Sequence, residues 1–294
     1  MVTQKSRRFR VIDRKIAIVG GTGQFGRHLG ERMDEKNEIF ISGKTVEDAQ
    51  EVAEERGWSY GPSTEIVEDA DVVIIAVPIA VTEEVIHEVG PHVPDDALLC
   101  DITSVKQMPT EAMREYSDEV LGMHPMYAPS NSVKGQKVVM CPERGKKWSE
   151  MEEFWEEHGA DLHFTEPEVH DKAMSLVQGL MHFSELVVAD VIRKSELSGD
   201  DMEEFSSPVY QLITDLTARM LNQKPGLYGS IQAENPENED VRERFIDSAE
   251  DIREIVGDEE AFAEKFDELG DEFDLEGAQN RTDLVIEFLS DEVR

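Results

Sequence analysis

The chain has 294 residues, enough for two domains, and its 65 acidic and 29 basic side chains give a formal net charge of −36, which makes nucleic acid a poor partner. The acidic residues are interleaved with periodic apolar residues, which favours a folded protein with an acidic surface, as in halophilic organisms, over a disordered chain. In molar salt the Debye length falls to ~3 Å, which screens the repulsion within such a surface.

Further classes of protein are excluded by the cysteine content and the hydropathy. Cys100 and Cys141 are too few for a disulfide framework and fit a reducing, cytoplasmic location. Cysteine and histidine pairs at zinc spacing are absent, so no metal site is expected. The basic N-terminus lacks the apolar core of a signal peptide, and no segment approaches ~20 consecutive apolar residues, so no membrane association is expected.

Short apolar runs alternate with amphipathic helical patterns in the first half of the chain. The helix predicted over residues 45–57 begins at Thr45 with Asp48 three residues later, a start that resembles a capping box, and ends at Gly57. Alternating strands and helices predict an α/β fold, a doubly wound, Rossmann-type parallel sheet over residues 1–165. The predicted strands cover residues 15–20, 38–42, 70–78, 97–102, 120–125 and 136–141, and the other helices cover 23–33 and 81–90.

The pattern changes after residue 165. Residues 166–294 read as helices separated by breaks such as SSP, KPG and ENPEN, which predicts an all-α domain. The segment 173–192 is apolar on almost every side, so as a helix it should be buried. Because one small domain offers little surface to cover such a helix, we expect a homodimer that forms through the helical domain.

Gly21, Gly23 and Gly26 form a Gly-x-Gly-x-x-Gly pattern that follows the first predicted strand and opens the first predicted helix. This context, rather than the pattern alone, predicts a dinucleotide site. Glycines allow a tight turn and a close approach of the backbone to a pyrophosphate at the helix N-terminus. The candidate cofactor-binding residues are therefore Gly21, Thr22, Gly23, Gln24, Phe25 and Gly26, together with Val77 and Pro78 at the end of the strand predicted over 70–78.

The end of the second strand bears on the choice between NAD and NADP. An NAD enzyme usually carries an acidic residue there, for the ribose hydroxyl, whereas this chain has Ser42, Lys44 and Thr45. Two hydroxyls and a lysine suit a 2′-phosphate, so we favour NADP over NAD. The competing interpretation is that Lys44 is a solvated turn residue.

Two polar motifs follow neighbouring predicted strands. Ser104 lies in DITSVK, after the strand predicted over 97–102, and His124 lies in LGMHPM, directly before a proline. A residue before proline is held in extended backbone, which aims the imidazole. Because parallel strands end at the same edge of a sheet, we expect Ser104 and His124 to lie side by side near the nicotinamide.

The glycine loop, D-x-x-S-V-K, G-x-H-P-M and the helical second half together resemble the prephenate dehydrogenase family, which includes arogenate dehydrogenases. Residues 170–183 and 206–236 extend the likeness, which covers about residues 15–240. The resemblance implies oxidation of the ring alcohol of prephenate, hydride transfer to NAD(P) and loss of the ring carboxylate as carbon dioxide, which gives 4-hydroxyphenylpyruvate on the way to tyrosine.

The resemblance also implies roles for particular residues. His124 would take the proton of the ring hydroxyl, and Ser104 would bind the same oxygen or orient the imidazole. Arg219 would bind a substrate carboxylate bidentately. Weaker substrate-binding candidates are Lys106, which could instead be a surface lysine at a helix start, and His182, which could instead be a core residue. Gln178, one turn before His182 on the same helix face, is a candidate neighbour of that histidine. No partner spacing suggests chemistry for the remaining histidines, at positions 28, 87, 92, 158, 163 and 170.

This sequence departs from the family pattern at two positions. Ala128 replaces a common glycine, and Gln211 stands where some relatives carry a second arginine. The latter leaves the choice between prephenate and arogenate open. We expect no mutase domain before the first strand and no regulatory domain after the last helix. Two other functions remain open: a different NADP oxidoreductase, such as a deazaflavin-linked one, and a non-catalytic nucleotide-sensing protein.

Overall fold

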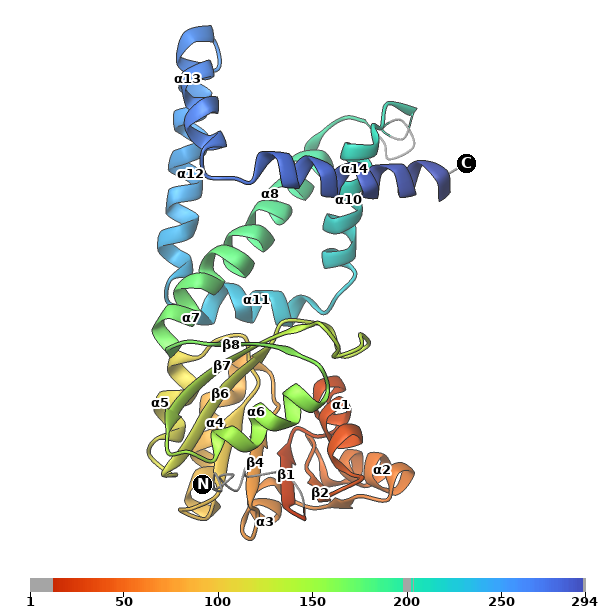
Figure 1. The fold of residues 1–294 in the computed structure, drawn as a ribbon, viewed down its shortest axis with the longest axis vertical. Coiled ribbons are helices and arrows are strands. Elements are labelled where there is room, and N and C mark those ends of the chain that lie inside the picture. The colour runs from red at the N-terminus through yellow and green to blue at the C-terminus, as the bar shows by residue number, and fades with distance from the viewer. Residues whose placement is uncertain (1–12, 198–201, 203, 293–294) are drawn as a thin grey trace, which may run out of the picture. The chain divides into compact units, whose positions relative to one another are not determined.

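The computed structural model describes residues 13–197, 202 and 204–292 (Figure 1). The chain divides into two compact units. Unit 1 comprises residues 1–174 and 233–236, and unit 2 comprises residues 175–232 and 237–294. The boundary predicted after residue 165 follows directly on the last strand, whereas the next helix, up to residue 174, still belongs to unit 1.

Unit 1 contains an eight-stranded sheet in the order β3-β2-β1-β4-β5-β6-β7-β8. The order reverses between β1 and β4, which is the switch point where doubly wound sheets bind their ligands. This arrangement, with a helical second unit, confirms the predicted fold class. The strands are β1 (Lys15–Val19), β2 (Glu38–Ile41), β3 (Ser59–Tyr60), β4 (Val72–Ile75), β5 (Leu98–Asp101), β6 (Glu119–Pro125), β7 (Lys137–Arg144) and β8 (Asp161–Phe164).

One strand departs from the predicted all-parallel sheet. β7, predicted as residues 136–141, pairs antiparallel with β6, whereas its other neighbour β8 is parallel to it. The reason is the connection, because a parallel neighbour needs a long crossover that usually contains a helix. The eleven residues between Pro125 and Lys137 contain no helix, so the chain turns back on itself.

Helices cover both faces of this sheet. Side chains along β1 alternate between the two apolar clusters that lie on these faces. Ile16 and Ile18 belong to one buried apolar cluster, whereas Ala17 and Val19 belong to the other. The first cluster is covered by α1 (Gln24–Met33), α2 (Val46–Arg56) and α6 (Trp148–Glu157), and the second by α3 (Ser63–Val67), α4 (Thr82–Val89) and α5 (Gln107–Met113).

The predicted ends of the second helix are confirmed. The Thr45 hydroxyl accepts a hydrogen bond from the backbone N–H of Asp48 at 3.1 Å, and Gly57 closes α2 in the left-handed conformation with φ of 74°. A side-chain acceptor at the N-cap and a glycine at the C-cap each satisfy backbone groups that the helix itself cannot.

Unit 2 is built from helices. α7 (Pro167–Met174), which belongs to unit 1, continues into a π-helical turn, η3 (Ser175–Leu180), and then into α8 (Met181–Lys194). Within the described residues after α8, the helices include α10 (Pro208–Leu221), α11 (Pro225–Glu234), α12 (Asn238–Ile255), α13 (Glu259–Gly270) and α14 (Leu275–Glu292).

The expectation that residues 173–192 form a buried helix is wrong for the single chain. No residue of α8 is fully buried, and Val191 is 64% exposed, because the described parts of the chain leave much of this apolar helix uncovered. The stretch Pro167–Lys194 is long and apolar enough to cross a membrane by length and composition alone. One helix of this kind is weak support for a span, since a helix covered by another protein surface has the same composition.

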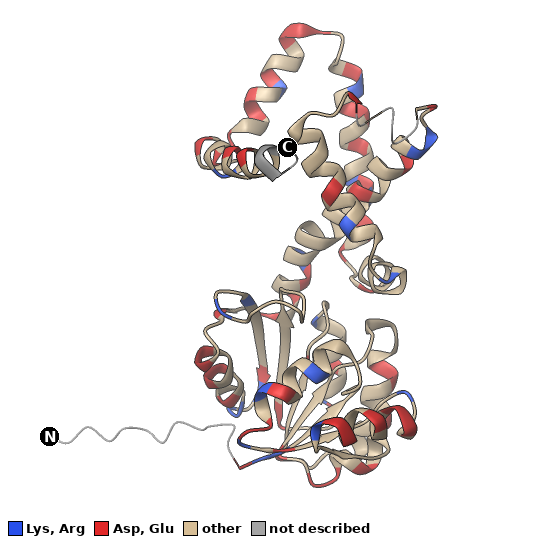
Figure 2. Cartoon of the chain, turned by 90° about the vertical axis from the view of Figure 1, so that its right-hand side faces the viewer, with Lys and Arg blue, Asp and Glu red and all other residues tan. Residues whose placement is uncertain are grey.

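Acidic side chains lie on the helices of both units. Figure 2 shows that Asp and Glu (red) far outnumber Lys and Arg (blue) on both of them. The core of unit 1, in contrast, is built from aliphatic strand residues such as Ile74 and Leu99, both fully buried. This separation of charge and apolar surface agrees with the predicted folded protein with an acidic surface.

Candidate active site

The loop between β1 and α1 is a tight turn that needs glycine. Gly20 has φ of +85°, and a Cβ there would lie 2.6 Å from the carbonyl oxygen of Ala76. A Cβ on Gly26 would lie 2.6 Å from the carbonyl oxygen of Gly20. α1 starts at Gln24 with no acidic residue in its first turn. The turn therefore offers backbone N–H groups and a helix dipole to an anion, which fits the pyrophosphate of a dinucleotide.

The predicted cofactor-binding residues of this loop share the carboxyl edge of the sheet. Gly21 is buried against Ile41, where a Cβ would come within 2.5 Å of that side chain. Gly23 and Gln24 are exposed, whereas Thr22 and Phe25 are half-buried. After the end of β4, the Val77 side chain lies beside Gly20 of the glycine turn, and Pro78 is exposed.

The three cofactor-binding candidates at the end of β2 differ in whether their polar side-chain groups are available to a cofactor. Ser42 is 1% exposed, and its hydroxyl accepts a hydrogen bond from Ser63 at 3.0 Å. The Thr45 hydroxyl is occupied as the N-cap of α2. Lys44 is exposed. A contact with a 2′-phosphate at this edge therefore depends mainly on Lys44.

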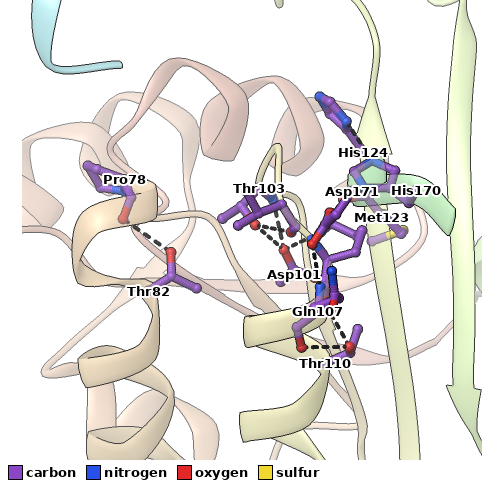
Figure 3. Close-up of polar contacts among 12 residues, drawn as sticks. Pro78, Thr82, Asp101, Thr103, Gln107, Thr110, Met123, His124, His170 and Asp171 are labelled. Carbon is purple, nitrogen blue, oxygen red and sulfur yellow. Dashed lines mark hydrogen bonds and ion pairs between the residues drawn. The ribbon is translucent and has the colours of Figure 1, made fainter. Parts of the chain in front are cut away.

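His124 lies at the carboxyl edge of the sheet, where β6 runs parallel to β5. Its side chain is 4% exposed, and its Nδ1 lies 2.9 Å from Nε2 of His170 (Figure 3). His170, on α7, is 1% exposed, and its own Nδ1 lies 2.7 Å from Oδ1 of Asp171. Three buried side chains thus form a row of hydrogen bonds that begins at the predicted catalytic histidine.

Burial sets the protonation state of the two imidazoles. Burial lowers the pKa of His124 well below its usual value of 6.5, and the nearby His170 and Lys106 lower it further. Burial also lowers the pKa of His170, although the hydrogen bond with Asp171 opposes this effect. His124 is therefore a neutral imidazole at pH 7, as a general base requires.

Lys106 does not occupy the position that either sequence interpretation expected. It is completely buried, and its ammonium group forms an ion pair with Asp101 and donates to the carbonyl oxygen of Met123 at 2.8 Å. Asp101 also accepts from the backbone N–H and the hydroxyl of Thr103, at 2.9 and 2.6 Å. A lysine bound in this way is a cation beneath the site rather than a substrate ligand on its surface.

The predicted catalytic Ser104 lies in the turn that leads from β5 to α5, half-buried. The same turn carries Thr103 and Lys106. Because Lys106 reaches the backbone of β6 at Met123, this turn lies beside the part of β6 that carries His124. The two motifs that the sequence placed on neighbouring strand ends are thus neighbours in space.

Among the histidines to which the sequence analysis gave no chemistry, two connect segments of unit 1 near the candidate site. One is His170, described above. The other is His28 on α1, whose Nδ1 lies 2.8 Å from the carbonyl oxygen of Pro129 and whose Nε2 lies 3.0 Å from the Tyr127 hydroxyl. His28 therefore ties the helix after the glycine turn to the loop after β6.

Comparison with known proteins places both units of the chain in one family. Residues 29–164 match the family model of the prephenate dehydrogenase nucleotide-binding domain, and residues 166–269 match that of the prephenate dehydrogenase dimerization domain. A T-protein of Haemophilus influenzae is 31% identical over 277 residues, which cover 86% of this chain and 69% of that protein.

The chain belongs to the prephenate dehydrogenase family.

A further relative is a Methanocaldococcus jannaschii protein named "Probable arogenate/prephenate dehydrogenase", which is 34% identical over 273 residues. The match covers 89% of this chain and 61% of that protein, so the chain spans about six to seven tenths of the length of these curated relatives. The prephenate dehydrogenase of Aquifex aeolicus, solved with hydroxyphenyl propionate and NAD+, shares the fold with a TM-score of 0.71 at 22% identity, over 86% of this chain and 95% of that one.

Three substrate-binding candidates of this prephenate dehydrogenase family chain lie in unit 2. Arg219 is exposed on α10, and Gln178 lies in the π-helical turn η3. His182, on α8, packs edge-to-face against the ring of Tyr228 on α11, with 4.6 Å between ring centroids. Burial lowers the pKa of His182. Gln211, the departure from the family pattern, donates to Asp215 one turn away at 2.8 Å.

His170 and Asp171 are the residues of the site that sequence reasoning missed. The adjacent histidine and aspartate in HDKAM were a visible signal, but they stand 46 and 47 residues after His124. Only the packing of α7 on this edge of the sheet brings them together, because β7, α6 and β8 intervene in the chain.

The contribution of the buried Lys106–Asp101 ion pair to stability can be tested by substitution. We expect Lys106→Met to lower the free energy of unfolding by ~3–5 kcal/mol, because it leaves the Asp101 carboxylate buried without its cation. Adding Asp101→Asn should restore at least ~1 kcal/mol, since a neutral amide costs less to bury. Urea unfolding gives both values. The control Lys36→Met breaks an exposed pair with Glu157 and should cost at most ~1 kcal/mol. A Lys106→Met variant as stable as this control would contradict the prediction.

Proposed function

We propose that the chain catalyses the NAD(P)-dependent oxidative decarboxylation of prephenate to 4-hydroxyphenylpyruvate. The observation that carries the proposal is the buried, neutral His124 at the carboxyl edge of a dinucleotide-binding sheet, in a chain of the prephenate dehydrogenase family. A base at this edge stands where doubly wound sheets hold their ligands. His124 is therefore suited to take a proton from an alcohol while its carbon loses hydride.

The proposed reaction assigns a step to each group. A bound nicotinamide dinucleotide supplies the acceptor for the hydride that leaves the ring carbon bearing the hydroxyl. The O–H bond of that hydroxyl breaks, and its proton passes to Nε2 of His124, since Nδ1 is engaged by His170. Ser104 orients the same hydroxyl or the imidazole. The bond between the ring and its carboxylate then breaks and carbon dioxide leaves. The electron pair of that bond completes the aromatic ring, and the ring oxygen takes its proton back from Nε2 of His124, which restores the product hydroxyl and the neutral base.

We propose NADP as the preferred cofactor. Support comes from the exposed Lys44 at the end of β2 and from the absence of an acidic side chain at positions 42–45. An acidic side chain there would bind the ribose hydroxyl of NAD and repel a phosphate. The glycine turn suits either cofactor, because it recognises only the pyrophosphate that the two share.

We propose Arg219 as the ligand of a substrate carboxylate, with His182 and Gln178 as further substrate-binding residues. A guanidinium holds a carboxylate through two parallel hydrogen bonds, which suits a dianion such as prephenate. Arogenate is the alternative substrate, since the family includes relatives named for it. Because the chain belongs to this family, arogenate dehydrogenase is a stronger alternative function than a deazaflavin-linked oxidoreductase. A non-catalytic nucleotide-sensing protein remains a possible outcome of the assay.

We propose a homodimer that forms through unit 2. Residues 166–269 match a dimerization domain, and unit 2 exposes large apolar side chains on several helices. Isolated exposed apolar residues are common, whereas many of them on one helical unit favour a surface that another protein covers. The most exposed are Val191, Phe205, Val256, Phe266, Phe273, Leu284 and Phe288, each at least 64% exposed.

We propose that the acidic surface adapts the protein to high salt, as in a halophilic cytoplasm. A net charge of −36 repels itself at low ionic strength, and molar KCl screens that repulsion to within ~3 Å. Assays of this protein should therefore be made in molar KCl.

The proposed function is tested by absorbance at 340 nm, with prephenate or arogenate and with NAD or NADP, in molar KCl. Formation of 4-hydroxyphenylpyruvate supports the proposal, and the faster cofactor tests the role of Lys44.

We expect His124→Asn to lower kcat by ~10²–10⁴-fold, because the base is lost while the substrate contacts remain. The control His163→Asn, at an exposed position on β8, should retain full activity. An unchanged kcat in His124→Asn would show that His124 is not the catalytic base.

A second variant tests carboxylate binding. We expect Arg219→Ala to raise the KM for prephenate by the equivalent of ~2–5 kcal/mol if the bound substrate excludes water from the pair, because one carboxylate of the dianion then loses a desolvated partner. Arg219→Lys should recover only part of this loss, since an ammonium group cannot bind bidentately. Arg193→Ala removes an arginine that pairs with Asp190 on α8 and serves as the control. A KM unchanged in Arg219→Ala would show that this arginine binds no substrate.

A third test concerns assembly. Light scattering in molar KCl should give twice the chain mass of 33.2 kDa. Val191→Asp should shift the protein toward the monomer, because it places a charge on the exposed apolar face of α8. Val169→Asp, an exposed valine of α7 in unit 1, is the matched control. A monomer before any substitution would refute the dimer.

A further inference from the structure

His124, His170 and Asp171 form an unbroken hydrogen-bonded row inside unit 1 (Figure 3). The two links measure 2.9 Å and 2.7 Å, and the three side chains are at most 4% exposed. The imidazole rings meet edge-to-face, with an interplanar angle of 66°. Buried polar groups of this kind are costly unless every link is made, so the row has a defined arrangement of protons.

The hydrogen bonds of Asp171 determine where the protons of this row reside. Its Oδ1 accepts from the backbone N–H of Lys106 at 2.7 Å, and its Oδ2 accepts from the backbone N–H of Gln107 at 2.9 Å. Both carboxylate oxygens therefore face donors that cannot act as acceptors, which suits the ionised form. The proton in the link to His170 consequently resides on Nδ1 of the imidazole.

The rest of the row follows from this proton. A neutral imidazole that carries its proton on Nδ1 has an acceptor at Nε2. Nε2 of His170 therefore accepts from Nδ1–H of His124, and neutral His124 presents an unprotonated Nε2. This is the tautomer that can take a proton from a substrate hydroxyl; the other tautomer can only donate from Nε2.

We propose that His170 and Asp171 are positioning residues that hold His124 in the tautomer, and the orientation, in which Nε2 is the base. The inference rests on the proposed function of His124. Sequence spacing assigned no chemistry to His170, and Asp171 was not among the candidates.

The row also stabilises the state that follows proton transfer. When His124 becomes an imidazolium, its Nδ1–H donates more strongly to His170, and the negative charge of Asp171 lies one ring away. Lys106, which is paired with Asp101, disfavours the positive charge on the His124 imidazolium. This favours loss of the proton from His124, which regenerates the neutral base. The charged groups that act on the row are thus Asp101, Lys106 and Asp171.

A purely structural role is the competing explanation, because Asp171 also binds the two backbone N–H groups at the start of α5. Substitution of Asp171 alone could disturb that turn. The decisive variants are therefore placed at His170, and the first measurement uses the unmodified protein.

The first experiment is ¹⁵N NMR of the full chain labelled at the histidine rings, with NADP present in molar KCl at pH 7. The ¹⁵N chemical shifts distinguish protonated from unprotonated ring nitrogens, and the variants His124→Asn and His170→Gln assign the signals. We expect His124 and His170 both to carry their proton on Nδ1. A proton on Nε2 of either ring would overturn the inference. This result does not depend on activity, so it stands even if neither prephenate nor arogenate is oxidised.

The second experiment compares His170→Leu with His170→Gln, after circular dichroism and thermal unfolding show both to be folded. The glutamine carbonyl can accept from Nδ1–H of His124, whereas leucine cannot. We expect His170→Leu to lower kcat by ~10²–10⁴-fold with the KM nearly unchanged, and His170→Gln to recover at least tenfold of that loss. His163→Gln is the matched control. Equal rates in the two His170 variants, or wild-type kcat in His170→Leu, would reject the role while leaving the proposed function intact.

Discussion

The buried ammonium group of Lys106 joins the parts of unit 1 that carry the candidate site. It pairs with Asp101 at the end of β5 and with the backbone of β6 next to His124, and the backbone N–H of the same residue binds Asp171 on α7. A lysine without solvent contact is tolerated only when its charge is paired and its donors are bonded. The positions of β5, β6 and α7 at this edge are therefore interdependent, and the row that starts at His124 depends on all three.

The site contains a neutral base inside a strongly acidic protein. Surface carboxylates would by themselves favour the charged form of every histidine. The Debye length at physiological salt is ~8 Å, so most of these charges are screened from a buried group. Burial and the cation of Lys106 act at short range and in a medium of low dielectric constant. They outweigh the net charge of −36, and the pKa of His124 falls rather than rises.

The two units distribute their apolar surface differently. In unit 1 both faces of the sheet are covered by helices, and strand residues such as Ile18 and Val73 are fully buried. In unit 2 no residue of α8 is fully buried, and α13 and α14 expose phenylalanines between acidic residues. Acidic side chains keep such a surface hydrated, whereas its apolar residues gain free energy only when another surface covers them.

Local patterns in the sequence determined the local features of this protein. The alternation of strands and helices, the glycine turn, the caps of α2 and the extended backbone of His124 before Pro125 depend on a few neighbouring residues, and these backbone features were predicted correctly. Tertiary structure alone decided the antiparallel pairing of β7, the burial of Lys106, the exposure of α8 and the contact of His170 with His124. Each of these depends on which distant segment packs against the residue, and that information is not contained in the spacing of residues along the chain.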